Sequence, residues 1–252
     1  MDAPVPPPLP AEDAPETREV ARRYALRDVV AQALAASDAP DRYSLLQPDV
    51  WQTVQERQRA MLRMLAARGW HDLAQRRLIE VGCGAGGNLL EFLRMGFLPQ
   101  HLTGLELLRP RYAMARQVLP QALRLHLGDA LRAPIAEASV DLVFQGTVFS
   151  SLLDDAYQQQ LADTMWRWVK PGGAVLWYDF TVDNPRNADV RGVPLARVRK
   201  LFPQARVEAR RMTLAPPIAR RVCGVHPGLY TLFNSLPLLR THVLVWLAKP
   251  VV

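Results

Sequence analysis

The sequence predicts an α/β fold with a doubly wound, mostly parallel sheet, and three observations carry that prediction. A short apolar segment, Leu78–Val81, is typical of a strand that is covered on both faces. It runs into a glycine-rich turn at 82–87, and apolar residues at helical spacing follow. The chain has 252 residues and 49% hydrophobic content, which suffices for one sizeable core.

The glycine turn is typical of a nucleotide-cofactor site, and its residues fit two motifs. Gly82, Gly84 and Gly87 satisfy G-x-G-x-x-G, the dinucleotide fingerprint, with Glu106 about 20 residues on for a ribose. The same stretch also reads E-x-G-x-G-x-G, from Glu80 to Gly86. The turn alone does not decide which of the two motifs applies, and so it does not identify the cofactor.

Composition limits the classes of protein. No apolar run approaches the roughly 18 residues that span a bilayer, and the proline-rich, acidic start lacks the pattern of a secretory signal, so we expect a cytoplasmic protein. Cys83 and Cys223 are the only cysteines, so a disulfide framework is not expected, and Cys83 reads as a small filler. No zinc-like spacing of Cys and His is present, and no metal site is predicted.

The net charge of +7 has two interpretations. It favours an anionic partner, such as a phosphorylated substrate, a nucleic acid or a membrane surface. Because the basic residues are dispersed, we favour the second interpretation, a compositional bias with solvated arginines.

Two helices are expected ahead of the first strand. Residues 1–15 are rich in proline and predict a disordered tail. Apolar residues at helical spacing then predict helices from Thr17 to about Ala36 and from Asp49 to about Arg68, where Gly69 ends the second. Residues 16–72 thus precede the sheet as a helical region, and the family resemblance given below implies that this region is a cap.

Acidic residues follow the second and third expected strands. His101–Glu106 reads as a strand that ends in Glu106, where a carboxylate either binds ribose hydroxyls or caps the helix that starts near Pro110. Leu123–Leu127 reads as the third strand, and Gly128-Asp129-Ala130 follows it. Asp129 alone also fits an ordinary turn aspartate.

The fourth and fifth expected strands place polar groups at the same edge. Ser139–Phe144 leads to Gln145 and Gly146, and Asp154-Asp155 is expected to cap the helix Tyr157–Val169. Lys170–Gly173 predicts a helix stop and a turn before the strand Ala174–Trp177, beyond which Asp179 lies.

The C-terminal third is expected to hold the specificity. A short helix at 193–202 and a strand at 205–214 precede an insertion of about 215–238, and the strand 242–248 ends the sheet. The family resemblance given below implies that the insertion forms a lid. Arg191, Arg220 and Arg221 with Tyr230 and Phe233 suggest an anionic or glycan acceptor, and an ordinary pair of surface helices fits equally well.

With these motifs in this order, the chain resembles the class I S-adenosylmethionine (SAM) methyltransferases of type 11. The resemblance rests on E-x-G-x-G-x-G, Glu106, Gly-Asp-Ala and the K-P-G-G turn, and it covers roughly residues 45–250. It implies a Rossmann-like, seven-stranded sheet with its last strand antiparallel. It implies that Glu106 binds the ribose and Asp129 the adenine amino group. The cofactor site it implies comprises Tyr43, Glu80, Gly82, Cys83, Gly84, Gly86, Asn88, Glu106, Leu107, Asp129, Ala130, Gln145 and Gly146.

The resemblance implies methyl transfer, in which the enzyme mainly holds the acceptor in line with an activated methyl group. The candidates for a base are Asp179, His226 and Asp155, each of which is more often structural. Elements such as Tyr-Asp-Phe, Asn-Pro-Arg and Leu-Ala-Pro-Pro look similar to methyltransferases of bacterial glycan and natural-product pathways. They suggest O-methylation of a sugar or small-molecule hydroxyl. Nucleic acid is not expected as a partner, since no Asn/Asp-Pro-Pro-Tyr motif is present.

Two alternatives stay open. One is a SAM-binding regulatory or partner protein without turnover, since no base is evident. The other is a methyltransferase for a membrane-associated glycolipid, because Val222–Leu239 is apolar and flanked by arginines, as in segments that lie on a bilayer surface. The oligomeric state is not indicated.

Overall fold

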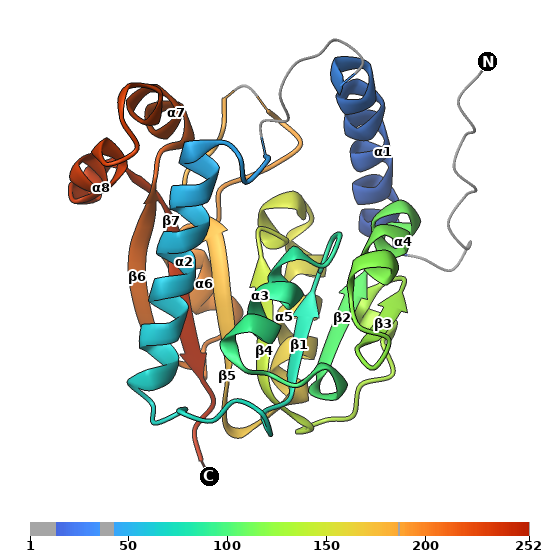
Figure 1. The fold of residues 1–252 in the computed structure, drawn as a ribbon. Helices are drawn as coiled ribbons and strands as arrows, with labels where there is room; N and C mark the ends of the chain where they lie inside the picture. Colours follow the sequence, from blue (N-terminus) through green and yellow to red (C-terminus); the bar gives the residue numbers. More distant parts are fainter. Residues whose placement is uncertain (1–13, 36–42, 186, 252) are drawn as a thin grey trace.

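The computed structural model of the chain describes residues 14–35, 43–185 and 187–251. It contains a seven-stranded sheet of order β3-β2-β1-β4-β5-β7-β6 (Figure 1). The strands are β1 Leu78–Val81, β2 Leu102–Glu106, β3 Arg124–Leu127, β4 Val140–Gly146, β5 Val169–Phe180, β6 Arg206–Leu214 and β7 Arg240–Ala248. Strands β1 to β5 pair in parallel, and β7 runs antiparallel to both β5 and β6. The expected fold is therefore confirmed, including the antiparallel last strand.

Helices cover both faces of the sheet, so each inner strand is buried on both sides. One apolar core contains residues of α2 (Pro48–Ala66), α3 (Gly87–Met95) and α4 (Arg109–Val118). The other contains residues of α1 (Pro15–Ala35), α5 (Asp155–Trp168) and α6 (Leu195–Leu201). Alternate residues of β1 divide between the two cores, Leu78 in the first and Ile79 in the second, as the period of a strand requires.

The order of the strands reverses beside β1, and this places the site. β1 pairs with β2 on one side and with β4 on the other. The connections that leave these two neighbours run to opposite faces of the sheet, which opens a crevice at the carboxyl ends of the strands. The short helices η2 (Ala130–Arg132) and η3 (Phe149–Ser151) start at this edge, while η1 (Pro99–His101) leads into β2 at the opposite edge.

The K-P-G-G segment differs from the expectation. It belongs to β5, where the chain bulges between the pairs Val140–Val169 and Leu142–Ala174. Gly172 has φ 79°, and its N–H donates to the Lys249 carbonyl of the C-terminal segment. A bulge with a left-handed glycine keeps the strand continuous where we expected a turn that precedes it.

The two N-terminal helices lie apart from each other (Figure 1). α2 packs across β6 and β7 and against α7 (Pro216–Val225), and it contributes Met61, Met64 and Leu65 to the core. α1 lies at the carboxyl edge of the sheet, beside α4 in the view of Figure 1. Of the expected disordered tail, residues 1–13 are outside the described residues, and α1 begins at Pro15.

The expected insertion lies between β6 and β7. It consists of α7, α8 (Leu229–Asn234) and η4 (Pro237–Leu239). β6 and β5 are both antiparallel to β7 and therefore run the same way, so the insertion leaves the sheet at the edge where the site lies. In the described part of the chain, no helix is long and apolar enough to span a bilayer.

Candidate cofactor and acceptor site

The turn after β1 is held in a conformation that favours glycine. Gly82, Gly84 and Gly86 have φ of 67°, 57° and 89°, which is the left-handed region that L side chains rarely adopt. The Cys83 N–H donates to the Leu105 carbonyl of β2, and the Gly86 N–H closes the turn on the Cys83 carbonyl. The turn is therefore fixed against the neighbouring strand before any ligand arrives.

These glycines serve different purposes. A Cβ on Gly82 would lie 2.5 Å from Val148 Cγ2, so that glycine allows the loop after β4 to pack against the turn. A Cβ on Gly84 would meet no atom within 4 Å, although Gly84 lines the pocket. Gly84 is therefore the position where the backbone faces open space.

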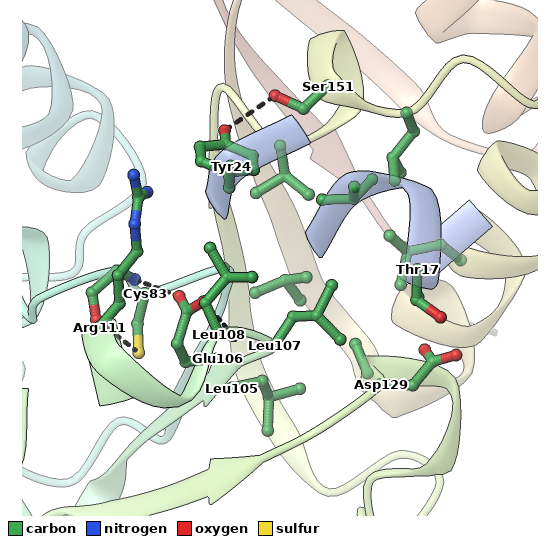
Figure 2. Close-up of a pocket in the computed structure, with 18 of the residues that line it drawn as sticks. Thr17, Tyr24, Cys83, Leu105, Glu106, Leu107, Leu108, Arg111, Asp129 and Ser151 are labelled. Atoms are coloured by element: carbon green, nitrogen blue, oxygen red, sulfur yellow. Dashed lines mark hydrogen bonds between the residues drawn. The ribbon is translucent and has the colours of Figure 1, made fainter. Parts of the chain in front are cut away.

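Glu106 ends β2 with a buried carboxylate that points into the pocket (Figure 2). Its Oε2 accepts from the Gly84 N–H at 2.7 Å, and its Oε1 accepts from the Leu108 N–H at 2.8 Å. Burial raises the pKa of this carboxyl, against these backbone hydrogen bonds and the charge of Arg111. A carboxylate oxygen accepts two hydrogen bonds, so both oxygens retain capacity for a ligand's hydroxyls.

Asp129 lies across the pocket from Glu106, after β3 (Figure 2). Its Oδ1 accepts from the Leu131 N–H at 2.9 Å and from the Tyr157 hydroxyl of α5 at 2.6 Å. Both bonds fix Oδ1, which leaves Oδ2 for an amino group of a ligand.

A network of hydrogen bonds between polar side chains supports the glycine turn. Asn88, at the start of α3, donates from Nδ2 to Glu80 Oε1 at 2.6 Å and accepts from Arg57 of α2 at 2.6 Å. Arg57 also contacts Glu91, at 3.2 Å. Burial raises the pKa of Glu80 to about 8, although the Asn88 hydrogen bond and the Arg57 charge oppose it. Glu80 does not line the pocket, so its part is to orient Asn88, which does.

The loop after β4 forms another wall. Gln145 is buried, and its Oε1 accepts from the Val148 N–H at 3.0 Å, which holds the loop. Thr147 has φ 59°, a strained conformation for a β-branched residue, and it lines the pocket with Gly146. Strain of this kind is kept where the surroundings fix the backbone.

Asp179 supports the same loop from β5. It is 0% exposed and accepts from the Ser150 N–H at 3.1 Å and from the Phe180 N–H at 2.9 Å. Burial raises the pKa of Asp179 to about 7, against hydrogen bonds from Ser150.

α1 covers the pocket, and its Tyr24 contacts two of the other walls. The Tyr24 hydroxyl lies 3.0 Å from Ser151 Oγ of η3, and the Arg111 guanidinium of α4 lies 4.4 Å from the Tyr24 ring centre (Figure 2). Arg27 lies 4.9 Å from the same ring. Thr17 and Val20 also line the pocket. One aromatic side chain therefore ties α1 to the elements that follow β2 and β4.

The predicted cofactor residues are largely brought together. The pocket is lined by Gly82, Cys83, Gly84, Asn88, Glu106, Leu107, Asp129, Ala130 and Gly146. Glu80, Gly86 and Gln145 lie behind it as supports. Tyr43 is 75% exposed before α2 and is not among the lining residues. Burial raises the pKa of the Cys83 thiol, which keeps it protonated and fits a small filler.

The three candidate bases do not line the pocket. Asp179 is enclosed behind the loop after β4. Asp155 pairs with Arg191 and Arg197 on the surface, and His226 is exposed at the end of α7, where its Nδ1 accepts from the Gly228 N–H. The expected Asp154 cap is confirmed, since its carboxylate accepts from the Tyr157 N–H at 2.8 Å. Tyr230 is buried on Glu56, so it does not join the arginines in an acceptor site.

Several lining residues were missed from the sequence. Tyr24, Thr17 and Val20 lie on a helix far from the glycine turn, and no motif singles them out. Arg111 comes five positions after Glu106, in the first turn of α4, and that spacing was a usable signal. Other lining residues outside the predicted cofactor set include Leu108, Val148, Leu152, Tyr157 and Leu161.

Comparison with known proteins agrees with the fold and the turn. The family model described as "Methyltransferase domain" matches residues 79–177, from β1 to β5. Demethylmenaquinone methyltransferase of Deinococcus radiodurans is 32% identical over 166 residues, 59% of each chain. Phthiotriol/phenolphthiotriol dimycocerosates methyltransferase 1 of Mycobacterium ulcerans is 32% identical over 132 residues, 50% of this chain and 47% of that protein. The chain thus aligns with about half the length of these relatives.

Solved structures share the architecture at low identity. A geranyl diphosphate C-methyltransferase from Streptomyces coelicolor has a TM-score of 0.60 at 16% identity, over 96% of this chain and all of that one. A [4+2]-cyclase has a TM-score of 0.63 at 16% identity, over 95% and 98%. Because proteins described as a methyltransferase and as a cyclase share this fold, the fold by itself does not assign the reaction.

Proposed function

We propose that this chain, which carries a methyltransferase domain on the class I SAM-dependent methyltransferase fold, binds SAM and transfers its methyl group to a hydroxyl of a small molecule. The observation that carries the proposal is that one pocket contains an open glycine position, Gly84, and two carboxylates on separate strand ends, Glu106 and Asp129. SAM has a ribose, an adenine amino group and a charged amino-acid end, and the pocket offers a partner for each.

Each part of the pocket has one task. Glu106 accepts from the ribose hydroxyls, and Asp129 accepts from the adenine amino group. The backbone of the turn and the start of α3, where Gly86 gives no side-chain cap, offers N–H groups to a carboxylate. When bound, SAM supplies a methyl group activated by a sulfonium. The chain's own residues then have to orient the acceptor and exclude water.

The side chains that line the rest of the pocket indicate which kind of acceptor it binds. They are apolar at Val20, Val148, Leu152 and Leu161, with hydroxyls on Thr17, Thr147, Ser151 and Tyr24. A sugar needs many polar partners, whereas an apolar body with one or two hydroxyls matches this lining. The two relatives are named for demethylmenaquinone and for phthiotriol/phenolphthiotriol dimycocerosates, and neither name is that of a sugar. Between the two acceptor classes of the sequence prediction, we therefore favour the small-molecule hydroxyl over the sugar.

The lack of a base in the pocket limits how weakly acidic the acceptor hydroxyl can be. The described residues that line the pocket include no His or Lys, and we assign both carboxylates to the cofactor. A phenolic hydroxyl has a pKa of about 10, far below that of an alcohol, and loses its proton without a strong base. Arg111, a cation on the pocket wall, favours the ionised form. We infer that the acceptor hydroxyl is phenolic or of similar acidity.

The test is methyl transfer from labelled SAM to a panel of hydroxylated quinols, phenols and alkyl glycosides, with S-adenosylhomocysteine as a second readout. Transfer to phenolic acceptors, faster as the pH approaches the acceptor's own pKa, is the expected result. Transfer to glycosides alone would contradict the acceptor class.

Glu106→Gln tests the cofactor assignment. The substitution keeps the shape but removes the charge that strengthens the ribose hydrogen bonds, so we expect SAM affinity to fall by about 1.5–3 kcal/mol, more than tenfold, in calorimetry. Glu137→Gln, at an exposed surface carboxylate, is the control and should bind as the parent does. Equal affinity in the two variants would remove Glu106 from the site.

A SAM-binding role without turnover is the second candidate. It is favoured by one observation, the absence of a His or Lys base among the described residues that line the pocket. Tight SAM binding without S-adenosylhomocysteine formation on any of the panel would support it.

A further inference from the structure

We propose that the hairpin of α7, α8 and η4, residues 216–239, docks on a lipid bilayer that carries anionic headgroups. This proposal does not depend on which acceptor the pocket takes. It starts from side chains on the hairpin that neither the fold nor the pocket uses.

The hairpin has an apolar inside and an apolar outside. Its inner side chains, Ala219, Val222, Cys223 and Tyr230, form a separate small core with Leu214. Its outward side chains are also large and apolar. Val225 is 79% exposed, Leu232 63%, Leu236 54% and Leu238 90%.

A second segment extends this surface. Leu45, Leu46 and Trp51 are exposed where the chain enters α2. This part of α2 contacts the hairpin, since Thr53 Oγ1 lies 3.3 Å from the Tyr230 hydroxyl and α2 packs on α7. We call Leu45, Leu46, Trp51, Val225, Leu232, Leu236 and Leu238 the apolar rim.

The hairpin is held rigidly, so the rim is a fixed feature. Glu56 of α2 accepts from the Tyr230 hydroxyl at 2.9 Å, from the Thr213 N–H at 3.1 Å and from Asn234 Nδ2 at 2.7 Å. Three hydrogen bonds to one carboxylate tie β6 and α8 to α2. A rigid hairpin presents its leucines to a partner without an ordering cost.

The charges identify the partner. From residue 209 to residue 252 the sequence has six Arg or Lys residues and no Asp or Glu. Arg220 and Arg221 are exposed on α7, beside the rim. Two carboxylates of α2 lie near the hairpin: Glu56 is engaged by Tyr230 and Asn234, and Asp49, whose charge acts on Cys223, is half-buried. Exposed leucines beside unpaired positive charge match an anionic lipid surface, which takes apolar side chains below its headgroups and attracts arginine.

The place of the rim in the fold fits such a partner. The hairpin leaves the sheet at its carboxyl edge (Figure 1). The pocket is lined by residues that follow the strands at the same edge. Since none of the described helices is long and apolar enough to span a bilayer, the contact we infer is with its surface.

Co-sedimentation of the full chain with vesicles tests the proposal. We expect binding to vesicles of phosphatidylglycerol and phosphatidylcholine and little binding to phosphatidylcholine alone, with weaker binding as NaCl rises. Absence of binding to the anionic vesicles would overturn the proposal.

Two variants identify the surface. Leu232→Ser, Leu236→Ser and Leu238→Ser combined, and separately Arg220→Glu with Arg221→Glu, should each reduce binding tenfold or more. The matched controls are Met114→Ser with Val118→Ser, each 54% exposed on α4, and Arg116→Glu with Arg124→Glu, also exposed. Thermal unfolding of all four variants checks that the fold is intact.

The outcomes separate the alternatives. Loss of binding in the hairpin variants alone supports the proposal, and equal loss in the controls overturns it. A second copy of the chain is the other partner that could cover such a surface, and sedimentation velocity tests for it. A parent protein that forms a dimer and binds no vesicles, together with a triple leucine variant that is monomeric, would assign the rim to a second copy and overturn the proposal.

Discussion

The site depends on backbone positions as much as on side chains. At Gly84 the left-handed φ and the open space above the Cα occur together, whereas at Gly82 the missing Cβ only makes room for Val148. Glycines of the same motif therefore serve different purposes: Gly84 gives a ligand access to the backbone, and Gly82 allows close packing.

Gly84→Val tests ligand access. Its Cβ projects into open space at φ 57°, so we expect SAM binding to be lost, in addition to a strain of about 1–2 kcal/mol. Gly69→Val is a matched control, because Gly69 has φ 70°, a Cβ there also meets no atom, and it lies at the end of α2 outside the pocket. Calorimetry on both variants should show loss only at Gly84; tight binding by Gly84→Val would mean that the turn does not approach the ligand.

Two buried carboxyls predict how stability depends on pH. The pKa of Glu80 is raised to about 8 and that of Asp179 to about 7, both above their unfolded values. The unfolded chain therefore releases these protons first, and the free energy of unfolding falls as pH rises, from about pH 4.5 to 8 for Glu80 and from about pH 4 to 7 for Asp179. Each group contributes a slope of about 1.4 kcal/mol per pH unit between its two pKa values.

Denaturant unfolding at several pH values checks this expectation. Glu80→Gln and Asp179→Asn remove one titrating group each, so each variant should lose its share of the slope while the other share remains. A slope that is unchanged in both variants would contradict the assignment.

At the scale of elements, the two N-terminal helices are held by different forces. α2 places four apolar residues in the core, Ala60, Met61, Met64 and Leu65. Among the side chains of α1 that the structure describes, Thr17, Val20 and Arg23 are buried and Tyr24 packs against the core. The other contacts of this part with the rest of the chain are polar: Arg23 with the Asp189 carbonyl, Glu16 with the Leu153 N–H, and the partly exposed ion pairs Arg27–Asp189 and Arg111–Asp28. Exposed ion pairs stabilise little and are screened by salt. α1 is thus the weakly held wall of the pocket.

Hydrogen exchange should separate the two helices. In 1 M NaCl, where the screening length is about 3 Å, we expect the amides of α1 to exchange faster and those of α2 to keep their protection. Tyr24→Leu should have a similar effect at low salt, because it removes the Ser151 hydrogen bond and both arginine contacts. Equal protection of α1 and α2 under both conditions would contradict a weakly held α1.

At the scale of the molecule, the pocket gathers groups from four parallel strand ends, so a ligand there couples distant parts of the chain. Ligand binding stabilises the native state by mass action, about 2.7 kcal/mol at a concentration of 100 Kd. For a domain of this size that raises Tm by roughly 5–10 °C.

Thermal scans with SAM and with NAD⁺ test the choice between the two cofactors that the glycine motif permits. We expect the shift with SAM and none with NAD⁺. Because Glu106 is expected to bind the ribose, Glu106→Gln should show a smaller shift at the same SAM concentration. A shift with NAD⁺ alone would restore the dinucleotide interpretation.

Much of the fold was predictable because its signals are local. Buried strands of a parallel sheet are short apolar runs, and the glycine turn, Glu106 and Gly-Asp-Ala mark three of the strand ends. The bulge at Lys170–Gly173 was not predictable, since the same residues also suit a turn, and only the pairing with Asp141's neighbours and with Lys249 keeps the strand continuous.

The candidate site divides in the same way. The sequence by itself determined the open turn after β1 and the two carboxylates, because glycine conformation and strand ends are properties of a few adjacent residues. Only the tertiary structure decided that Tyr24 of a distant helix closes the pocket, that Arg57 reaches Asn88, and that Asp179 lies behind a loop. Those contacts join residues 29 to 127 positions apart, and the packing of helices on a sheet, which no local pattern encodes, brings them together.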